Sequence, residues 1–162
     1  MTVEEKLHQA VQAWQPRFHR VATVAECADH INRPHEDYPR RVGMTAHLIK
    51  HLIKGAYWSV LAGDCLQLHK LLMADKPYLA GKWRTITVEL AGSGYVPPAP
   101  LFVPELITAC FPFSPLTEDD LITFYTRFQC IHPFNDGNGR VGGILVAALS
   151  KLLFGYYLTP GQ

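Results

Sequence analysis

The sequence of 162 residues has no long apolar run. Charged residues or glycines interrupt every apolar stretch well before the roughly 20 residues that a transmembrane helix requires. The N-terminal segment, MTVEEKLHQAVQAW, carries acids early and lacks the apolar region of a secretory signal. We therefore expect no membrane partner. The expected location is the cytoplasm, or the cytosol of a host cell if the protein is exported without such a signal.

The chain also lacks a strong charge of either sign and lacks paired cysteines. Its formal net charge is +1, whereas capture of nucleic acid relies on a concentrated basic surface. We therefore expect no nucleic-acid partner. The cysteines stand far apart, with neither a CxxC pair nor a zinc-like spacing, and each lies in or beside an apolar run. We expect buried thiols in a reducing compartment at Cys27, Cys65, Cys110 and Cys130.

What the sequence does contain is a helical pattern over most of its length. Thr2 and Glu5 fit a capping box at the start of a first helix, which is expected to end before Pro16. Thr117 and Asp120 have the same spacing before a later helix. Apolar positions recur at three- and four-residue spacing in several further segments. Helices are predicted over residues 44–63, 64–75, 99–111 and 118–132, and from near residue 138 through residue 155.

Two segments depart from this pattern. Residues 28–43 are polar and contain two prolines, which predicts a loop or a poorly ordered connection. Residues 81–98 alternate β-branched residues around a Gly-Ser-Gly turn, which predicts a β-hairpin whose second arm, closed by two prolines, is an exposed edge. The length suits one domain over residues 1–162. The expected fold class is mainly α, a helical bundle with one β-hairpin.

A polar, glycine-rich stretch interrupts the apolar C-terminal part of the chain. It reads IHPFNDGNGRVGG, residues 131–143, and lies between two predicted helices. Pro133 ends the first helix near His132. Gly137 and Gly139 permit the positive-φ geometry of a tight turn that can hold an anion. The following helix directs free N–H groups and a positive dipole end toward this turn, which predicts a phosphate site.

The side chains around this turn suit phosphate chemistry. Arg140 supplies a fork of donors for phosphate oxygens. Asp136 would repel an anion by itself, and its presence is understandable if it holds Mg²⁺. His132 has the pKa range of a general base, and Phe134 is expected to anchor the loop in the core. Each residue alone has an ordinary structural explanation, but their combination within a few residues favours a functional site.

The motif resembles that of the Fic family of nucleotidyltransferases (the Fic/Doc fold), which reads H-x-F-x-[D/E]-G-N-G-R-x-x-R. The matching residues are His132, Phe134, Asp136, Gly137, Asn138, Gly139 and Arg140. The stretches LHKLLMADKPYLAGKWRTITVEL, GYVPPAP and VPEL resemble the helix, the flap hairpin and the next helix of Fic domains. The resemblance covers residues 45–157 and implies a Fic-like helical bundle, with an N-terminal helix and loop over residues 1–44.

The resemblance implies transfer of AMP from ATP to a Ser, Thr or Tyr hydroxyl of a target protein. His132 would take the hydroxyl proton, and Asp136 would hold Mg²⁺ bridging the α- and β-phosphates. A target segment would add as a strand along the flap near residues 83–96. The groups implied to bind the phosphates and the leaving pyrophosphate are Asn138, Arg140 and the backbone of Gly137 and Gly139.

Two parts of the family pattern are missing. Gly143 stands where relatives have a second arginine, which contacts the terminal phosphate and pairs with an inhibitory glutamate. The inhibitory motif, [S/T]-x-x-x-E-[G/N], is missing as well. Together these absences indicate loss of self-inhibition, and an antitoxin-like inhibitor remains open. An arginine at position 143 would lie one turn after Arg140 and is expected to face the same side.

Several alternatives follow from the sequence. The missing arginine leaves open another nucleotide or a pyrophosphate-linked donor, or a decayed Fic-fold module that only binds a partner. The Doc branch, which phosphorylates its target, has lysine where Gly139 stands, so phosphorylation is less expected. A metal-dependent enzyme built on His47 and His51 is a further alternative, because these residues are four apart on a predicted helix. No third ligand accompanies them at a recognisable spacing.

Overall fold

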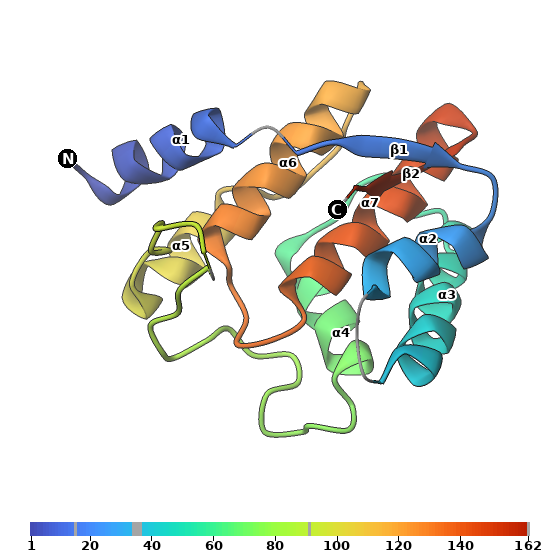
Figure 1. The fold of residues 1–162 in the computed structure, drawn as a ribbon, viewed down its shortest axis with the longest axis horizontal. Helices are drawn as coiled ribbons and strands as arrows, with labels where there is room; N and C mark the ends of the chain where they lie inside the picture. Colours follow the sequence, from blue (N-terminus) through green and yellow to red (C-terminus); the bar gives the residue numbers. More distant parts are fainter. Residues whose placement is uncertain (15, 34–36, 91, 162) are drawn as a thin grey trace.

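The computed structural model describes residues 1–14, 16–33, 37–90 and 92–161. The described chain is mainly helical (Figure 1), which confirms the predicted fold class. Its helices are α1 (Val3–Ala13), α2 (Val24–Asn32), α3 (Tyr38–Lys54), α4 (Ala62–Leu72), η1 (Pro100–Phe102), α5 (Val103–Thr108), α6 (Glu118–Ile131) and α7 (Asn138–Phe154). None of the helices in these residues is both long and apolar enough to cross a membrane.

The centre of the molecule is α7, which is buried along most of its length. Its sequence is apolar on nearly all sides, and such a helix is stable only when other elements surround it. Figure 1 shows α6 along one side of α7 and α2 and α3 on the other, and all of them pack against it. The glycine-rich stretch lies between α6 and α7, so the core itself fixes the position of this loop.

The predicted helix caps are present. Thr2 Oγ1 accepts a hydrogen bond of 3.1 Å from the N–H of Glu5 at the start of α1. At the start of α6, Thr117 Oγ1 accepts from the N–H of Asp120 at 3.2 Å, and Asp120 Oδ2 accepts from the N–H of Thr117 at 3.0 Å. The capping box therefore begins the helix that carries the motif histidine at its other end.

The predicted loop over residues 28–43 is wrong over most of that range. Helix α2 continues to Asn32, and α3 begins at Tyr38, with Pro39 in its first turn. Proline is compatible with that position because the first N–H groups of a helix have no intrahelical partner. Residues 34–36 lie outside the described residues. The helix predicted over residues 44–63 also ends early, at Lys54.

The predicted hairpin over residues 81–98 forms no strand within the described residues of that segment. The Gly-Ser-Gly turn is present, with positive φ at Gly92 and Gly94, but the described residues on either side of it form no ladder. The strands occur elsewhere: β1 (Phe18–Val21) pairs antiparallel with β2 (Tyr157–Pro160). A pairing between the two ends of the chain leaves no local turn signal, and for this reason the sequence pattern did not reveal it.

Candidate active site

The motif histidine is the residue that ends α6. His132 has φ 53° and ψ 61°, the left-handed conformation of a helix C-cap, and its N–H donates to the Phe128 carbonyl at 3.0 Å. A left-handed residue other than glycine is uncommon and persists only where its surroundings hold it.

Arg84 ties the end of α6 to the segment expected to form the flap. Its guanidinium is buried, at 3% exposure for the residue, and it donates to the carbonyls of His132 at 2.6 Å and Ile131 at 3.1 Å. It also donates to the carbonyls of Ile86 at 2.9 Å and Pro98. The bonds to Ile131 and His132 satisfy carbonyls at the end of α6, which the last turn of a helix leaves without partners. Arg84 was not among the predicted site residues.

His69 makes a second link between the flap segment and the motif loop. The Gly81 N–H donates to His69 Nδ1 at 2.9 Å, and Nε2 lies 2.9 Å from the Asp136 carbonyl oxygen. Because Nδ1 accepts, Nε2 carries the proton and donates, so the ring is neutral. Burial lowers the pKa of His69, which favours the same neutral form. His69 was not among the predicted site residues either, since a histidine in an apolar helix carries no distinctive sequence signal.

Phe134 anchors the loop, as predicted. It is fully buried and stacks on the ring of His69, with ring centroids 3.7 Å apart and an interplanar angle of 5°. The ring of Trp83 lies on it as well, at 5.1 Å. Stacking between aromatic rings and burial together fix the loop to α4 and to the start of the flap segment.

Asn138 uses its side chain to close the turn. Its Nδ2 donates to the Phe134 carbonyl at 2.8 Å, and its Oδ1 accepts from the Phe134 N–H at 2.8 Å. Gln129 Nε2 donates to the Asn138 carbonyl at 2.9 Å. The amide side chain is thus engaged within the loop, and Asn138 has its backbone N–H to offer an anion.

The cradle itself consists of the first turn of α7. Gly137 has φ 88°, which a residue with a side chain rarely adopts, and a Cβ built at Gly139 would meet no atom within 4 Å. The amides of a helix's first turn lack intrahelical acceptors. These amides, together with the positive end of the helix dipole, can bind a phosphate group.

Asp136 stands between two cations at the edge of the cradle. Its Oδ2 is 3.5 Å from Lys76 Nζ and 3.6 Å from Arg140 Nη2, and its Oδ1 accepts from the Gly137 N–H at 2.8 Å. Burial opposes its ionisation, but the positive charge of Arg140, the Gly137 N–H and Lys76 outweigh this, so the pKa of Asp136 lies below its ordinary value. The carboxylate is ionised and partly exposed, and is available to a cation.

The environment of His132 favours its neutral form. Burial lowers its pKa and outweighs the Gln129 carbonyl, which favours the charged ring, while the positive charge of Arg84 acts in the same direction as burial. Its Nδ1 is buried and makes no hydrogen bond within the described part of the chain. A neutral imidazole can accept a proton, so the ring is in the state that a general base requires at neutral pH.

A side chain at position 143 of α7 would point at Ile31. A Cβ built on Gly143 would lie 2.8 Å from Ile31 Cγ1 and 3.0 Å from Ile31 Cδ1, in the contact between α2 and α7. An arginine there would have to displace Ile31 before it could face the phosphate site together with Arg140. The absence of a side chain at 143 lets α2 approach α7 closely.

We predict that Gly143→Arg destabilises the protein by about 1–3 kcal/mol, as overpacked core substitutions do, despite the better helix propensity of arginine. Chemical denaturation of the variant measures this loss. Ile31→Ala should relieve part of it when the two changes are combined, with a coupling of about 0.5 kcal/mol or more in a double-mutant cycle. A single variant as stable as the wild type would show that Ile31 does not pack against this position.

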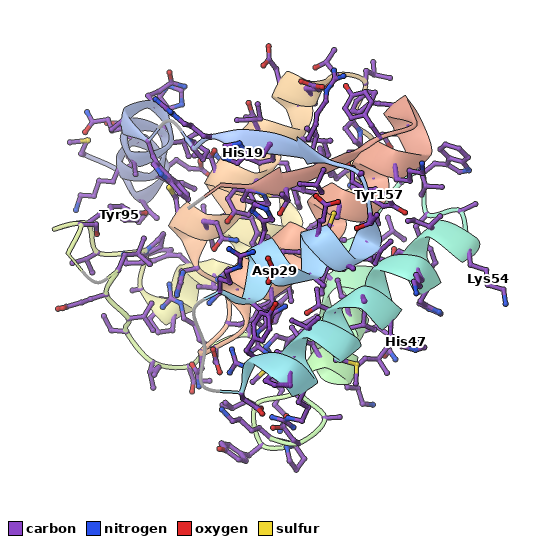
Figure 2. All side chains as sticks on the ribbon, turned by 45° about the vertical axis from the view of Figure 1, so that its right-hand side comes forward. His19, Asp29, His47, Lys54, Tyr95 and Tyr157 are labelled. Carbon is purple, nitrogen blue, oxygen red and sulfur yellow. The ribbon has the colours of Figure 1, made fainter. Side chains whose placement is uncertain are left out.

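The two histidines of the alternative metal site have no further ligands beside them in the described part of the chain. His47 and His51 are both exposed on α3, and Figure 2 shows His47 directed away from the body of the molecule. No group of three or more His, Cys, Asp or Glu side chains that could hold a metal occurs among the described residues. The spacing of the two histidines is that of an exposed helix face.

Comparisons with known proteins match the part of the chain that builds this site. The model of the Fic/DOC family matches residues 60–150. A probable protein adenylyltransferase of Aquifex aeolicus (strain VF5) is 40% identical over 72 residues, which is 41% of this chain. The matched part spans 22% of that protein's length.

Proposed function

The chain belongs to the Fic/DOC family, and from this premise we propose that it is a protein adenylyltransferase. It transfers AMP from ATP to the hydroxyl of a serine, threonine or tyrosine in a target protein. The observation that carries the proposal is the position of His132 at the end of α6, next to the first turn of α7. The probable protein adenylyltransferase to which part of the chain is similar supports AMP as the transferred group.

The reaction requires a base for the target hydroxyl and a site that binds the phosphates. His132 takes the proton from the target hydroxyl as the hydroxyl oxygen forms a bond to the α-phosphorus. The bond between the α-phosphorus and the bridging oxygen to the β-phosphorus breaks, and pyrophosphate leaves with that electron pair. The first-turn amides of α7 and the guanidinium of Arg140 stabilise the charge of the leaving group. Positioning and electrostatic stabilisation supply most of the catalysis in such phosphoryl-centre transfers.

Asp136 suits a Mg²⁺ ion that arrives with the nucleotide. Mg²⁺ is commonly held by one or two carboxylates together with substrate phosphates and waters, so a single ionised carboxylate beside a phosphate cradle fits it. A bound Mg²⁺ would neutralise part of the negative charge of the nucleotide phosphates. Asp136 then holds the ion, and Lys76 and Arg140 remain available to the phosphate oxygens.

We predict that Asp136→Ala abolishes the Mg²⁺ dependence of ATP binding, because it removes the carboxylate at the cradle. Titration calorimetry with ATP, in the presence and absence of Mg²⁺, measures this. Asp119→Ala is the matched control, since Asp119 is exposed in the first turn of α6, away from the motif loop. Unchanged Mg²⁺ dependence in the Asp136 variant would count against the assignment.

The pH dependence of transfer follows from the lowered pKa of His132. Only the neutral ring accepts a proton, so activity is lost as the pH falls through the pKa of the histidine in the folded protein. Because that pKa lies below the ordinary value of about 6.5, we predict that the acid limb of kcat/KM lies below pH 6.5. Rates measured from pH 5 to 8 at constant ionic strength test this. A limb at or above pH 6.5 would contradict it.

We further propose that the target segment docks along the flap, residues 83–96. The extended arms of this segment form no ladder in the described residues, which leaves backbone groups for an added strand. Ile86 and Val96 are exposed there and can meet side chains of the target.

A panel of labelled nucleotides added to a cell lysate tests the function. ATP labelled at the α-phosphate should label target proteins, whereas ATP labelled at the γ-phosphate should not, because pyrophosphate leaves. Labelling by another nucleotide would identify a different donor, which the glycine at position 143 keeps open. Absence of labelling with every donor, together with retention of a bound partner, would favour a non-catalytic binding module.

A further inference from the structure

Two cations from outside the motif, Arg41 and Lys76, lie in the same cavity as the motif residue Arg140. A cavity of about 620 Å³ is lined by Arg140 of α7, Arg41 of α3 and Lys76 after the end of α4, and also by the ion-paired side chains of Arg40, Asp37 and Asp75. Figure 1 shows the first turn of α3 near the end of α4, and the ion pair between Arg40 and Asp75 joins these two segments at 2.9 Å. The cavity therefore continues from the cradle toward α3.

The two neighbouring arginines of α3, Arg40 and Arg41, differ in their ion pairs. Arg40 is mostly exposed and forms ion pairs with both Asp37 and Asp75. Arg41 is half-buried and forms no ion pair within the described residues. Its Nε is buried and has no hydrogen-bond partner there. A guanidinium held in this way lacks the anion that would satisfy it.

The positive charges around the cavity are only partly balanced by protein groups. Burial lowers the pKa of Arg140, and the positive charge of Arg41 lowers it further. Arg140 is 8% exposed, and besides the Asp136 carboxylate at 3.6 Å its guanidinium contacts the Met73 sulfur at 3.5 Å. Lys76 shares the same carboxylate. A concave surface with excess positive charge attracts a polyanion.

We propose that Arg41 binds the terminal phosphate of a nucleoside triphosphate, and so supplies the cation that the motif lacks at position 143. The proposal rests on the proposed function, because it extends the phosphate chain of the donor from the first turn of α7 into this cavity. Ile31 occupies the direction from Gly143, so the cation reaches the phosphates from α3. The triphosphate is then held between Arg140 and Arg41.

Nucleotides that differ only in their phosphates test this subsite. We expect Arg41→Gln to weaken binding of Mg²⁺-ATP by roughly 10- to 100-fold, the range of a charge-assisted hydrogen-bonding group. Binding of AMP, which lacks the distal phosphates, should change by less than about threefold on the same scale. Titration calorimetry with ATP, ADP and AMP measures each dissociation constant, and the effect should be largest for ATP.

Two further variants serve as controls. Lys50→Gln removes a charge from the same helix at an exposed position outside the cavity, and should bind all three nucleotides as the wild type does. Arg41→Lys keeps the charge without the fork and should recover part of the ATP affinity. Since both Arg41 variants are compared through the ratio of ATP to AMP affinity, a modest loss of stability does not imitate the expected result.

Failure of the subsite and failure of the proposed function give different results. ATP affinity in Arg41→Gln within about twofold of the wild type, or equal weakening of ATP and AMP, would overturn the subsite even if AMP transfer is observed. Conversely, ATP binding that depends on Arg41 in a protein that labels no target would support the subsite and overturn adenylyl transfer.

Discussion

Replacing His132 with alanine is expected to reduce AMP transfer by about 10²- to 10⁴-fold, the usual contribution of a general base. The side chain is only partly buried and lies at the end of α6, so we expect the fold to survive the change. ATP binding should remain, because the cradle consists of the first turn of α7. Transfer of the α-phosphate label and calorimetry with ATP measure the two quantities separately.

The left-handed backbone of His132 requires its own control, because alanine adopts this conformation less readily than histidine. His132→Asn removes the base and retains a residue that tolerates the conformation, so it should be as inactive and closer to the wild type in stability. His47→Ala, at an exposed position on α3 (Figure 2), should leave transfer unchanged. A His132 variant that labels targets at the wild-type rate would show that another group is the base.

Replacing Arg84 with methionine is expected to lower the free energy of unfolding by about 3 kcal/mol or more. Methionine fills similar space but donates no hydrogen bond, and each buried carbonyl left without a partner costs about 1–3 kcal/mol. Four carbonyls lose their donor, at Ile86, Pro98, Ile131 and His132. Because two of them belong to the turn that carries the histidine, kcat should fall as well, while ATP affinity changes little.

Denaturant unfolding of Arg84→Met, beside a matched Arg20→Met variant, measures this contribution. Arg20 is exposed and paired with Glu118 at 3.4 Å, and exposed ion pairs contribute at most about 1 kcal/mol. Arg84→Lys retains the charge and should recover part of the stability and of kcat. A methionine variant within about 1 kcal/mol of the wild type would mean that water replaces the guanidinium at little cost.

The local parts of this protein were predictable from local signals. The spacing of Thr117 and Asp120 predicted the cap of α6, and the apolar stretch after Asn138 predicted α7. The tight turn between them followed from proline and glycine within a few residues. Cap, helix period and turn depend on neighbours in the chain, which is why a single sequence is enough to predict them.

The hairpin prediction failed because residues 81–98 make hydrogen bonds with side chains and with α6 and do not pair as two strands in the described residues. The carbonyls of Ile86 and Pro98 accept hydrogen bonds from Arg84, and Tyr95 Oη donates to the Cys130 carbonyl at 2.9 Å. The segment is thereby held against α6 and does not pair with itself in the described residues. An alternating pattern indicates one buried face, and it does not identify the element that buries it.

The amino-acid sequence alone was enough to predict the motif, the family resemblance that it carries, and the order of helix, turn and helix around it. The distant residues that surround the site became apparent from the packing: Arg84 at the histidine, His69 at the loop, Ile31 in front of Gly143 and Arg41 in the cavity. Arg84 and His132 are 48 positions apart, and His69 and Asp136 are 67 apart. The first contact arises where the flap segment lies against the end of α6 and the second where α4 meets the motif loop, and no local pattern contains either.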